Sequence, residues 1–204
     1  MYIKINLDYN SLEPYIDNKT LMLHYNVIYS SYIDKLNKLL KKNNYKDNYS
    51  LNELVDKIDM FPLEDRGEIL YNLGGALNHK LYFYEMSDKG NNIPYGEILK
   101  DINKYFGSYD NFKKEFIKKA LNLVGSGYTF LVMDESGKLQ IINTSNEDTP
   151  YSYGFIPIIV LDLWEHSYYL KYTTNKEAYI NNWFNLLDFK KINDLYIENK
   201  KSLF

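Results

Sequence analysis

The 204-residue sequence predicts an α+β fold, in which an N-terminal antiparallel helical hairpin is followed by an α/β domain with a three-stranded antiparallel sheet. Two long segments with helical periodicity before residue 85 predict the hairpin. Three short apolar segments beyond residue 127, separated by turn residues, predict the sheet. A polar stretch at 87–94 that contains glycine and proline lies between these regions. We therefore expect two domains, at 1–88 and 89–204.

The first helix is predicted to begin after a capping residue, Asp17 or Asn18, and to end near Lys42. Five residues recur at helical spacing and should share one face of this helix: Leu21, His24, Ile28, Tyr32 and Leu36. The polar residues 41–50 predict a loop after the helix.

A short second helix is expected at 52–59, and the segment Met60-Phe61-Pro62 ends it. The third helix is predicted at 64–84. One stripe of it carries Asn72, Gly75 or Ala76, His79 and Phe83. The first and third helices are long enough to pack as the antiparallel hairpin.

Beyond the linker, helical and strand patterns follow one another. We expect helices at 95–106 and 109–123, strands at 128–133, 139–143 and 155–161, and a helical tail from about 166 to 200. The glycines of Gly125-Ser126-Gly127 precede the first strand, and residues 134–138 supply the turn that joins the first two strands.

The composition, with 45% hydrophobic and 25% charged residues, is that of an ordinary globular protein. A net charge of −3 argues against a dedicated nucleic-acid-binding protein. No apolar run approaches the roughly 18 residues of a membrane span, and the N-terminus lacks the apolar core of a signal peptide. We therefore expect a cytoplasmic protein without a membrane segment. The absence of cysteine excludes disulfides, thiolate ligands and a thiol nucleophile.

Tyrosine is unusually frequent, with 22 residues, and Arg66 is the only arginine. Asn, Lys, Ile and Tyr have AT-rich codons, so a low-GC genome explains this bias. Oxidative cross-linking through tyrosine is the alternative explanation, and the enrichment alone does not decide between the two.

The chain has three histidines, and each falls in a position that suits a metal ligand. His24 and His79 lie within the two long helical patterns, whereas His166 follows Asp162 by four residues, directly after the apolar run 155–161. A strand end followed by a turn can direct both of these side chains at one point. Three imidazoles and one carboxylate suit a first-row metal such as manganese or iron.

Each of these residues also has a simpler interpretation. A single histidine on an apolar helix face is usually a hydrogen-bonded core residue, and an aspartate four residues before a histidine is common by chance. The combination of all four residues favours a metal site.

The segment from Asp162 to Tyr172, Asp-Leu-Trp-Glu-His-Ser-Tyr-Tyr-Leu-Lys-Tyr, closely resembles the metal-binding signature of the iron/manganese superoxide dismutases. Further segments are similar to landmarks of that family, and together they span nearly the whole chain: 12–24, 72–79, 106–112, 125–128 and 146–150. The resemblance implies the same α+β fold.

The resemblance also implies the activity and the site. Superoxide would be converted to oxygen and hydrogen peroxide by one-electron cycling of one manganese or iron ion per subunit. The implied metal ligands are His24, His79, Asp162 and His166. Gly75 is small, as in the manganese branch of the family, which slightly favours manganese. The implied catalytic residues around the metal are Tyr32 and Glu147.

A homodimer is implied in the same way. Glu165 would reach His166 of the other subunit, Tyr169 would lie at the same interface, and Trp164 would form a packing wall beside the metal. Neither nucleic acid nor a membrane is an expected partner.

Several residues depart from the family pattern. Ile28 replaces a histidine that would meet Tyr169 across the dimer, Glu147 replaces a glutamine, and Lys176 replaces an arginine. Phe83, Tyr128 and Phe130 replace tryptophans. These departures leave open an alternative: a weakly active or inactive metal protein with a structural role in a spore coat or a surface layer, and hence a location there instead of the cytoplasm.

Overall fold

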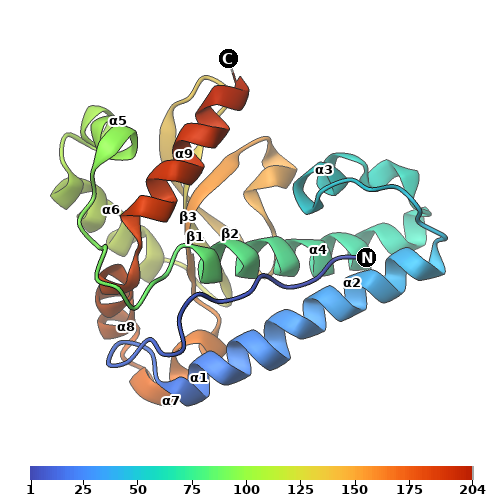
Figure 1. Cartoon of the computed structure of the whole chain (residues 1–204), viewed down its shortest axis with the longest axis horizontal. Helices are drawn as coiled ribbons and strands as arrows, with labels where there is room; N and C mark the ends of the chain where they lie inside the picture. Colours follow the sequence, from blue (N-terminus) through green and yellow to red (C-terminus); the bar gives the residue numbers. More distant parts are fainter. Residues whose placement is uncertain (204) are drawn as a thin grey trace.

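The computed structural model describes residues 1–203, and its N-terminal half is a helical hairpin (Figure 1). The first arm consists of α1 (Asn18–Leu23), the π-helix η1 (His24–Tyr29) and α2 (Ser30–Lys42), and α4 (Leu63–Tyr84) forms the second arm. Between the arms lie α3 (Leu51–Asp56) and the 3-10 helix η2 (Ile58–Met60). The predicted hairpin is confirmed.

The first arm begins at the predicted cap, where the side chain of Asp17 accepts a hydrogen bond of 2.9 Å from the backbone N–H of Thr20. The regular α-helical face predicted through Ile28 was wrong. The π-turn inserts extra chain after His24, so Tyr29 is fully buried and Ile28 is only half-buried. Tyr29 therefore takes the core position that the 3.6-residue period had assigned to Ile28.

The C-terminal half contains the predicted three-stranded antiparallel sheet. Two helices, α5 (Gly96–Phe106) and α6 (Tyr109–Leu121), precede the strands β1 (Gly127–Met133), β2 (Leu139–Ser145) and β3 (Ile156–Asp162). The strand order is β2-β1-β3, with β1 paired antiparallel to both neighbours. The 3-10 helix η3 (Pro150–Tyr153) lies between β2 and β3. The α+β fold class is confirmed.

The tail is helical, as expected, but broken into five pieces: η4 (Glu165–Ser167), α7 (Tyr169–Tyr172), α8 (Lys176–Trp183), η5 (Phe184–Leu186) and α9 (Phe189–Leu203). Thr173 has a positive φ of 49°, which ends α7, and the side chain of Asn175 caps α8. Two backbone hydrogen bonds, from Ser87 to Leu186 and from Asp188 to Glu85, then tie the segment before α9 to the end of α4.

One core serves both halves of the molecule. All seven residues of the central strand β1 are buried, and β3 packs against α4 of the hairpin. The C-terminal end of β3 therefore opens onto the inner faces of α1, η1 and α4. Within residues 1–203, every helix is either too short or too polar to cross a bilayer.

Candidate metal centre

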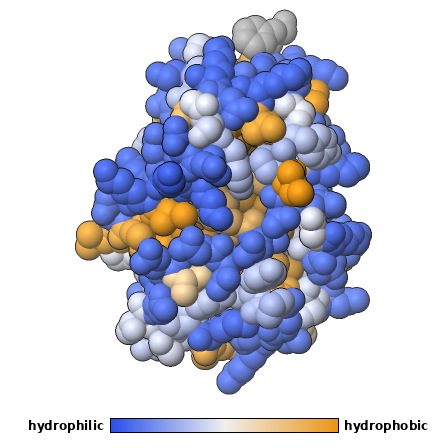
Figure 2. All heavy atoms as spheres, turned by 90° about the vertical axis from the view of Figure 1, so that its left-hand side faces the viewer, coloured by the Kyte–Doolittle hydropathy of each residue, from blue (hydrophilic) through white to orange (hydrophobic). Residues whose placement is uncertain are grey.

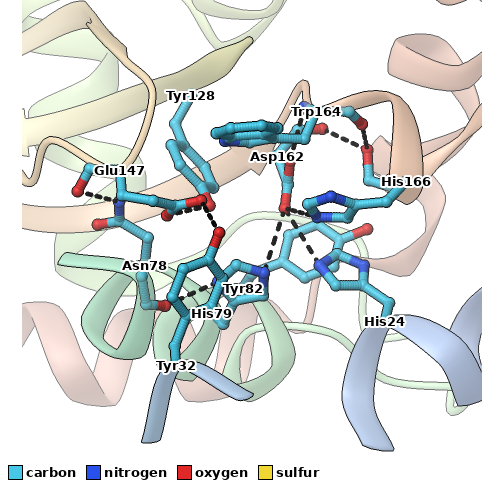
Figure 3. A network of polar contacts seen from close by, with 12 residues as sticks. His24, Tyr32, Asn78, His79, Tyr82, Tyr128, Glu147, Asp162, Trp164 and His166 are labelled. Atoms are coloured by element: carbon cyan, nitrogen blue, oxygen red, sulfur yellow. Dashed lines mark hydrogen bonds and ion pairs between the residues drawn. The ribbon is translucent and has the colours of Figure 1, made fainter. Parts of the chain in front are cut away.

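Four side chains converge between the hairpin and the sheet (Figure 3). His24 is the first residue of η1, His79 lies near the end of α4, Asp162 ends β3, and His166 lies in η4. One ligand atom from each residue lies within 4.8 Å of the other three. The sequence separates these residues by up to 142 positions, and the fold brings them to one point.

Asp162 lies at the centre of this group and is fully buried. Its Oδ1 accepts a hydrogen bond of 2.8 Å from the backbone N–H of Trp164, which orients the carboxylate. Its Oδ2 faces the imidazoles, 3.1 Å from Nε2 of His24 and 3.2 Å from Nε2 of His166. The Nε2 of His79 lies 3.8 Å from the same oxygen.

The tautomer of His79 follows from its hydrogen bond. Its Nδ1 lies 2.7 Å from the carbonyl oxygen of Gly75, and a carbonyl can only accept, so Nδ1 carries the proton and Nε2 is left with a free lone pair. The Nε2 atoms of His24 and His79 are both buried, and neither has a hydrogen-bond partner within residues 1–203. Buried polar atoms are rarely left unpaired. These two nitrogens, aimed at one carboxylate oxygen, fit a metal ion.

The protonation states suit a cation as well. Burial lowers the pKa of His24 to about 4 and that of His79 to about 3, so both imidazoles are neutral at pH 7. Burial alone would raise the pKa of Asp162, but the nearby charge of His166 and the contacts with both imidazoles hold it well below its usual range. For His166, the attraction of Asp162 outweighs burial and raises the pKa.

A second group of polar residues lies beside the four. Glu147 is 1% exposed, and each of its two carboxylate oxygens accepts a hydrogen bond from a phenol. Tyr32 donates to Oε1 over 2.6 Å, and Tyr128 donates to Oε2 over 2.7 Å. Burial raises the pKa of Glu147 to about 7, although the two phenols oppose this shift. The two predicted catalytic residues, Tyr32 and Glu147, are thus hydrogen-bonded to each other.

Two glycines of α4 make room for this arrangement. A Cβ atom at Gly74 would lie 1.9 Å from the carbonyl oxygen of Glu147, and one at Gly75 would lie 2.4 Å from the ring of Tyr32. Asn78 holds the loop that carries Glu147 against α4, because its amide donates to the carbonyl oxygen of Asp148 over 3.2 Å. A side chain at position 75 would therefore occupy the space that the ring of Tyr32 fills.

Aromatic rings enclose the imidazoles. The ring of Phe83 lies 4.9 Å from that of His24, the ring of Tyr128 lies 6.2 Å from that of His79, and Trp164 stacks on His166 at 5.8 Å. Phe130 lies behind Tyr128, with the ring centroids 5.9 Å apart. These aromatic rings thus build a wall around the site.

Sequence reasoning missed three further tyrosines. Tyr29 stacks on His79 with ring centroids 5.9 Å apart, and Tyr82 lies 5.1 Å from the ring of His24. Tyr179 donates to the backbone carbonyl of Asp162 over 2.9 Å. A helical-spacing argument from His79 would have pointed at Tyr82, three residues further along the same face. Tyr29 and Tyr179 carried no such signal.

The remaining predicted positions lie at the edge of the site. Glu165 is exposed and its carboxylate is 3.4 Å from the hydroxyl of Ser126, while Tyr169 is 51% exposed. Lys176 is half-buried and donates to the carbonyl of Leu123 over 3.3 Å. Within this chain, neither Glu165 nor Tyr169 faces the four central residues, so the roles expected of them require a second subunit.

Two domains of one known protein family match nearly the whole chain. The alpha-hairpin domain of iron/manganese superoxide dismutases matches residues 2–87, and the C-terminal domain of the same family matches residues 94–195. Manganese superoxide dismutase 2 of Bacillus anthracis is 37% identical over 195 residues, which cover 96% of this chain and 93% of that protein.

Two other superoxide dismutases are similar to this chain over most of its length. The manganese/iron superoxide dismutase 2 of Staphylococcus aureus strain Mu50 is 37% identical over 188 residues, or 92% of each chain. Manganese superoxide dismutase 1 of Leptolyngbya boryana is 36% identical over 196 residues, which cover 95% of this chain and 79% of that protein.

A helical hairpin and an α+β domain together enclose three imidazoles and one carboxylate, a group that could hold a metal ion. The chain belongs to the iron/manganese superoxide dismutase family. Its activity is that of the family, the conversion of superoxide to oxygen and hydrogen peroxide. A purely structural role is not favoured by these relatives.

Proposed function

We propose that His24, His79, Asp162 and His166 bind one manganese or iron ion in each subunit and that this ion is the redox centre of the enzyme. The observation that carries the proposal is the pair of buried, unpartnered Nε2 atoms that face the ionised carboxylate of Asp162. Manganese is the metal we favour, because a small residue at position 75 resembles the manganese branch of the family. The ring of Tyr32 lies against α4 at this glycine and leaves no room for a longer side chain.

The bound metal would supply the one-electron exchange by which two superoxide anions and two protons become oxygen and hydrogen peroxide. The protein supplies an apolar, enclosed site in which charges act strongly. Tyr32 donates a hydrogen bond of 2.6 Å to Glu147, and the pair would provide a route for protons beside the ion. The positive charge of Lys176 would favour approach of the anionic substrate.

We also propose a homodimer in which Glu165, His166 and Tyr169 lie at the interface. Apolar side chains that are 42–58% exposed, on contacting elements α1, η1 and α7, support this proposal: Leu23, Val27 and Leu170. Figure 2 shows apolar atoms gathered within a mainly polar surface on the side of the molecule at the left of Figure 1. Sedimentation velocity of the purified protein tests the proposed homodimer, and a monomer at micromolar concentration would contradict it.

Two further assignments stay proposals. We keep 1–88 and 89–204 as the domains, which separate expression of the two parts would test. We keep the cytoplasm as the location, with the spore coat or cell surface as the alternative, and fractionation of the cells that make the protein distinguishes them.

The substitution Asp162→Asn tests the metal site. It removes the charge that three imidazoles face, so we expect metal content after purification to fall at least about 10-fold, with dismutation lost. Asp101→Asn is the matched control, because Asp101 is an ion-paired carboxylate on α5 that contacts Lys200. A folded Asp162→Asn protein with full metal content would contradict the assignment.

A further inference from the structure

A chain of two phenols connects two of the proposed metal ligands from behind. Tyr82 on α4 is 1% exposed, and its ring packs against His24 with centroids 5.1 Å apart. Its hydroxyl lies 3.1 Å from the hydroxyl of Tyr179 on α8, which is fully buried. The hydroxyl of Tyr179 in turn lies 2.9 Å from the backbone carbonyl of Asp162.

The direction of these hydrogen bonds is determined by the last acceptor. A backbone carbonyl only accepts, so Tyr179 donates its single proton to Asp162. Tyr179 can then only accept from its other neighbour, which makes Tyr82 the donor in the bond between the two hydroxyls. The chain therefore runs in one direction, from Tyr82 through Tyr179 to the last residue of β3.

Burial makes this direction permanent at ordinary pH. Desolvation raises the pKa of both phenols well above the usual value, so neither loses its proton. Within residues 1–203, one other side chain lies within hydrogen-bonding distance of the same carbonyl. It is the hydroxyl of Ser167 at 3.0 Å, whose single proton is shared with the carbonyl of Trp164 at 2.7 Å. The carbonyl of Asp162 therefore depends mainly on the hydroxyl of Tyr179 among these side chains, and that hydroxyl accepts from Tyr82.

We infer that Tyr82 and Tyr179 are positioning residues of the metal centre, which keep the Asp162 carboxylate and the His24 imidazole at a fixed separation. Tyr82 acts on both ligands, through its ring on His24 and through its hydroxyl on Asp162. Tyr179 acts on Asp162 alone. This inference rests on the proposed metal binding by those two residues.

Phenylalanine substitutions separate the packing of the rings from the hydrogen bonds of the hydroxyls, because they keep the ring and remove the donor. In Tyr179→Phe, the carbonyl of Asp162 loses the hydroxyl on which it mainly depends. In Tyr82→Phe, the wall beside His24 remains and Tyr179 loses its only donor. We expect Tyr179→Phe to have the larger effect on metal binding. The double variant should equal Tyr179→Phe, since both residues act in series.

The experiment compares apo proteins titrated with Mn²⁺ alone. We expect a chelator-competition Kd about 10-fold weaker in Tyr179→Phe and about 3-fold weaker in Tyr82→Phe, as outer partners of metal ligands commonly cause. The Mn²⁺ electron paramagnetic resonance spectrum should show changed zero-field splitting in both variants. Tyr196→Phe is the control, because Tyr196 is equally buried but donates to Asp101 on α5.

Unchanged Kd and unchanged spectra in both variants would overturn the inference, and so would equal changes in Tyr196→Phe. Thermal unfolding of the apo proteins shows whether all three substitutions destabilise the fold alike, which leaves the spectrum as the specific readout. The Asp162→Asn protein separates the two proposals: if it retains tight Mn²⁺ binding, the metal site itself is wrong. If it loses the metal while the tyrosine variants match the wild type, only the positioning role fails.

Discussion

At the scale of single residues, Glu147 is the side chain whose environment is most unlike that of an ordinary glutamate. Both of its oxygens accept from phenols, and it has no lysine or arginine partner among the salt bridges of residues 1–203. A neutral amide in its place would keep the shape but remove one negative charge. That charge, when present, favours the oxidised metal.

The substitution Glu147→Gln should therefore raise the reduction potential of the bound metal above pH 7 and change the dismutation rate. At an effective dielectric constant of about 20, one charge close to the ion is worth on the order of 2 kcal/mol, which corresponds to a shift on the order of 100 mV. Redox titration and pulse radiolysis measure the two quantities. Glu177→Gln, an exposed change at the start of α8, serves as control; unchanged potential and rate in Glu147→Gln would refute the assignment.

Gly75 allows a second prediction at this scale. In Gly75→Ala the new methyl group would meet the ring of Tyr32 at 2.4 Å, so the ring must move away from Glu147. We expect a loss of roughly 1–3 kcal/mol in unfolding free energy and a slower enzyme. Urea denaturation and rate measurements test both effects.

Gly67→Ala on the same helix is the matched control, because nothing lies within 4 Å of its Cβ position. Its greater helix propensity should stabilise the protein by up to about 1 kcal/mol. If the two alanine variants behaved alike, the close contact between α4 and Tyr32 would have no energetic consequence.

At the scale of elements, a buried carboxylate joins the end of α4 to the edge strand β3. Glu85 is fully buried, and the one donor to its carboxylate among residues 1–203 is the backbone N–H of Val160, 3.0 Å from Oε2. Its own N–H and C=O continue the backbone pairing of α4 and the segment before α9. Glu85 forms no ion pair within residues 1–203, and burial raises its pKa well above the ordinary value of 4.5.

This raised pKa gives a pH dependence of stability. The folded protein holds the proton of Glu85 more tightly than the unfolded chain, so its contribution is fully present below pH 4.5 and declines as pH rises through the folded pKa. In that window, the unfolding free energy should fall by up to about 1.4 kcal/mol per pH unit from this residue. Glu85→Gln, which mimics the protonated acid, should remove this slope.

Urea denaturation of the metal-free wild type and Glu85→Gln between pH 5 and pH 8 measures the difference in slope. Other groups titrate in both proteins alike and cancel in the comparison. Parallel curves would show that Glu85 is ionised in the folded state, contrary to the structure.

At the scale of the whole molecule, the proposed metal site joins the two halves. The hairpin contributes His24 and His79, and the C-terminal half contributes Asp162 and His166. Because the first two imidazoles are already neutral and the carboxylate is already ionised, only His166 must lose a proton before it can bind a metal.

Binding of Mn²⁺ to the apo protein should therefore release up to about one proton at pH 6, and the release should fall towards zero as pH rises past the pKa of His166. Affinity should increase with pH over the same range and then level off. Isothermal titration calorimetry in buffers of different ionisation enthalpy measures the protons released. A release of two or three protons would mean that His24 or His79 is charged in the apo protein.

The helices and strands of this chain could be predicted because their signals are local. The capping Asp17, the helical period of α4 and the three apolar strands each lie in one short stretch of sequence. The π-turn after His24 could not be predicted, because it is stabilised by long-range packing, in which Tyr29 is buried against His79. The break before α9 likewise depends on pairing between residues about 100 positions apart.

By itself, the sequence predicted the fold class, because helical period and strand pattern are properties of neighbouring residues. Its resemblance to a known family indicated the family and the four residues that the structure brings together. Only the tertiary structure decided which nitrogen of His79 is free, that Glu147 accepts from two phenols, and that Tyr82 and Tyr179 stand behind the ligands. Those features depend on distances of a few ångströms between distant segments, and such distances exist only once the chain has packed.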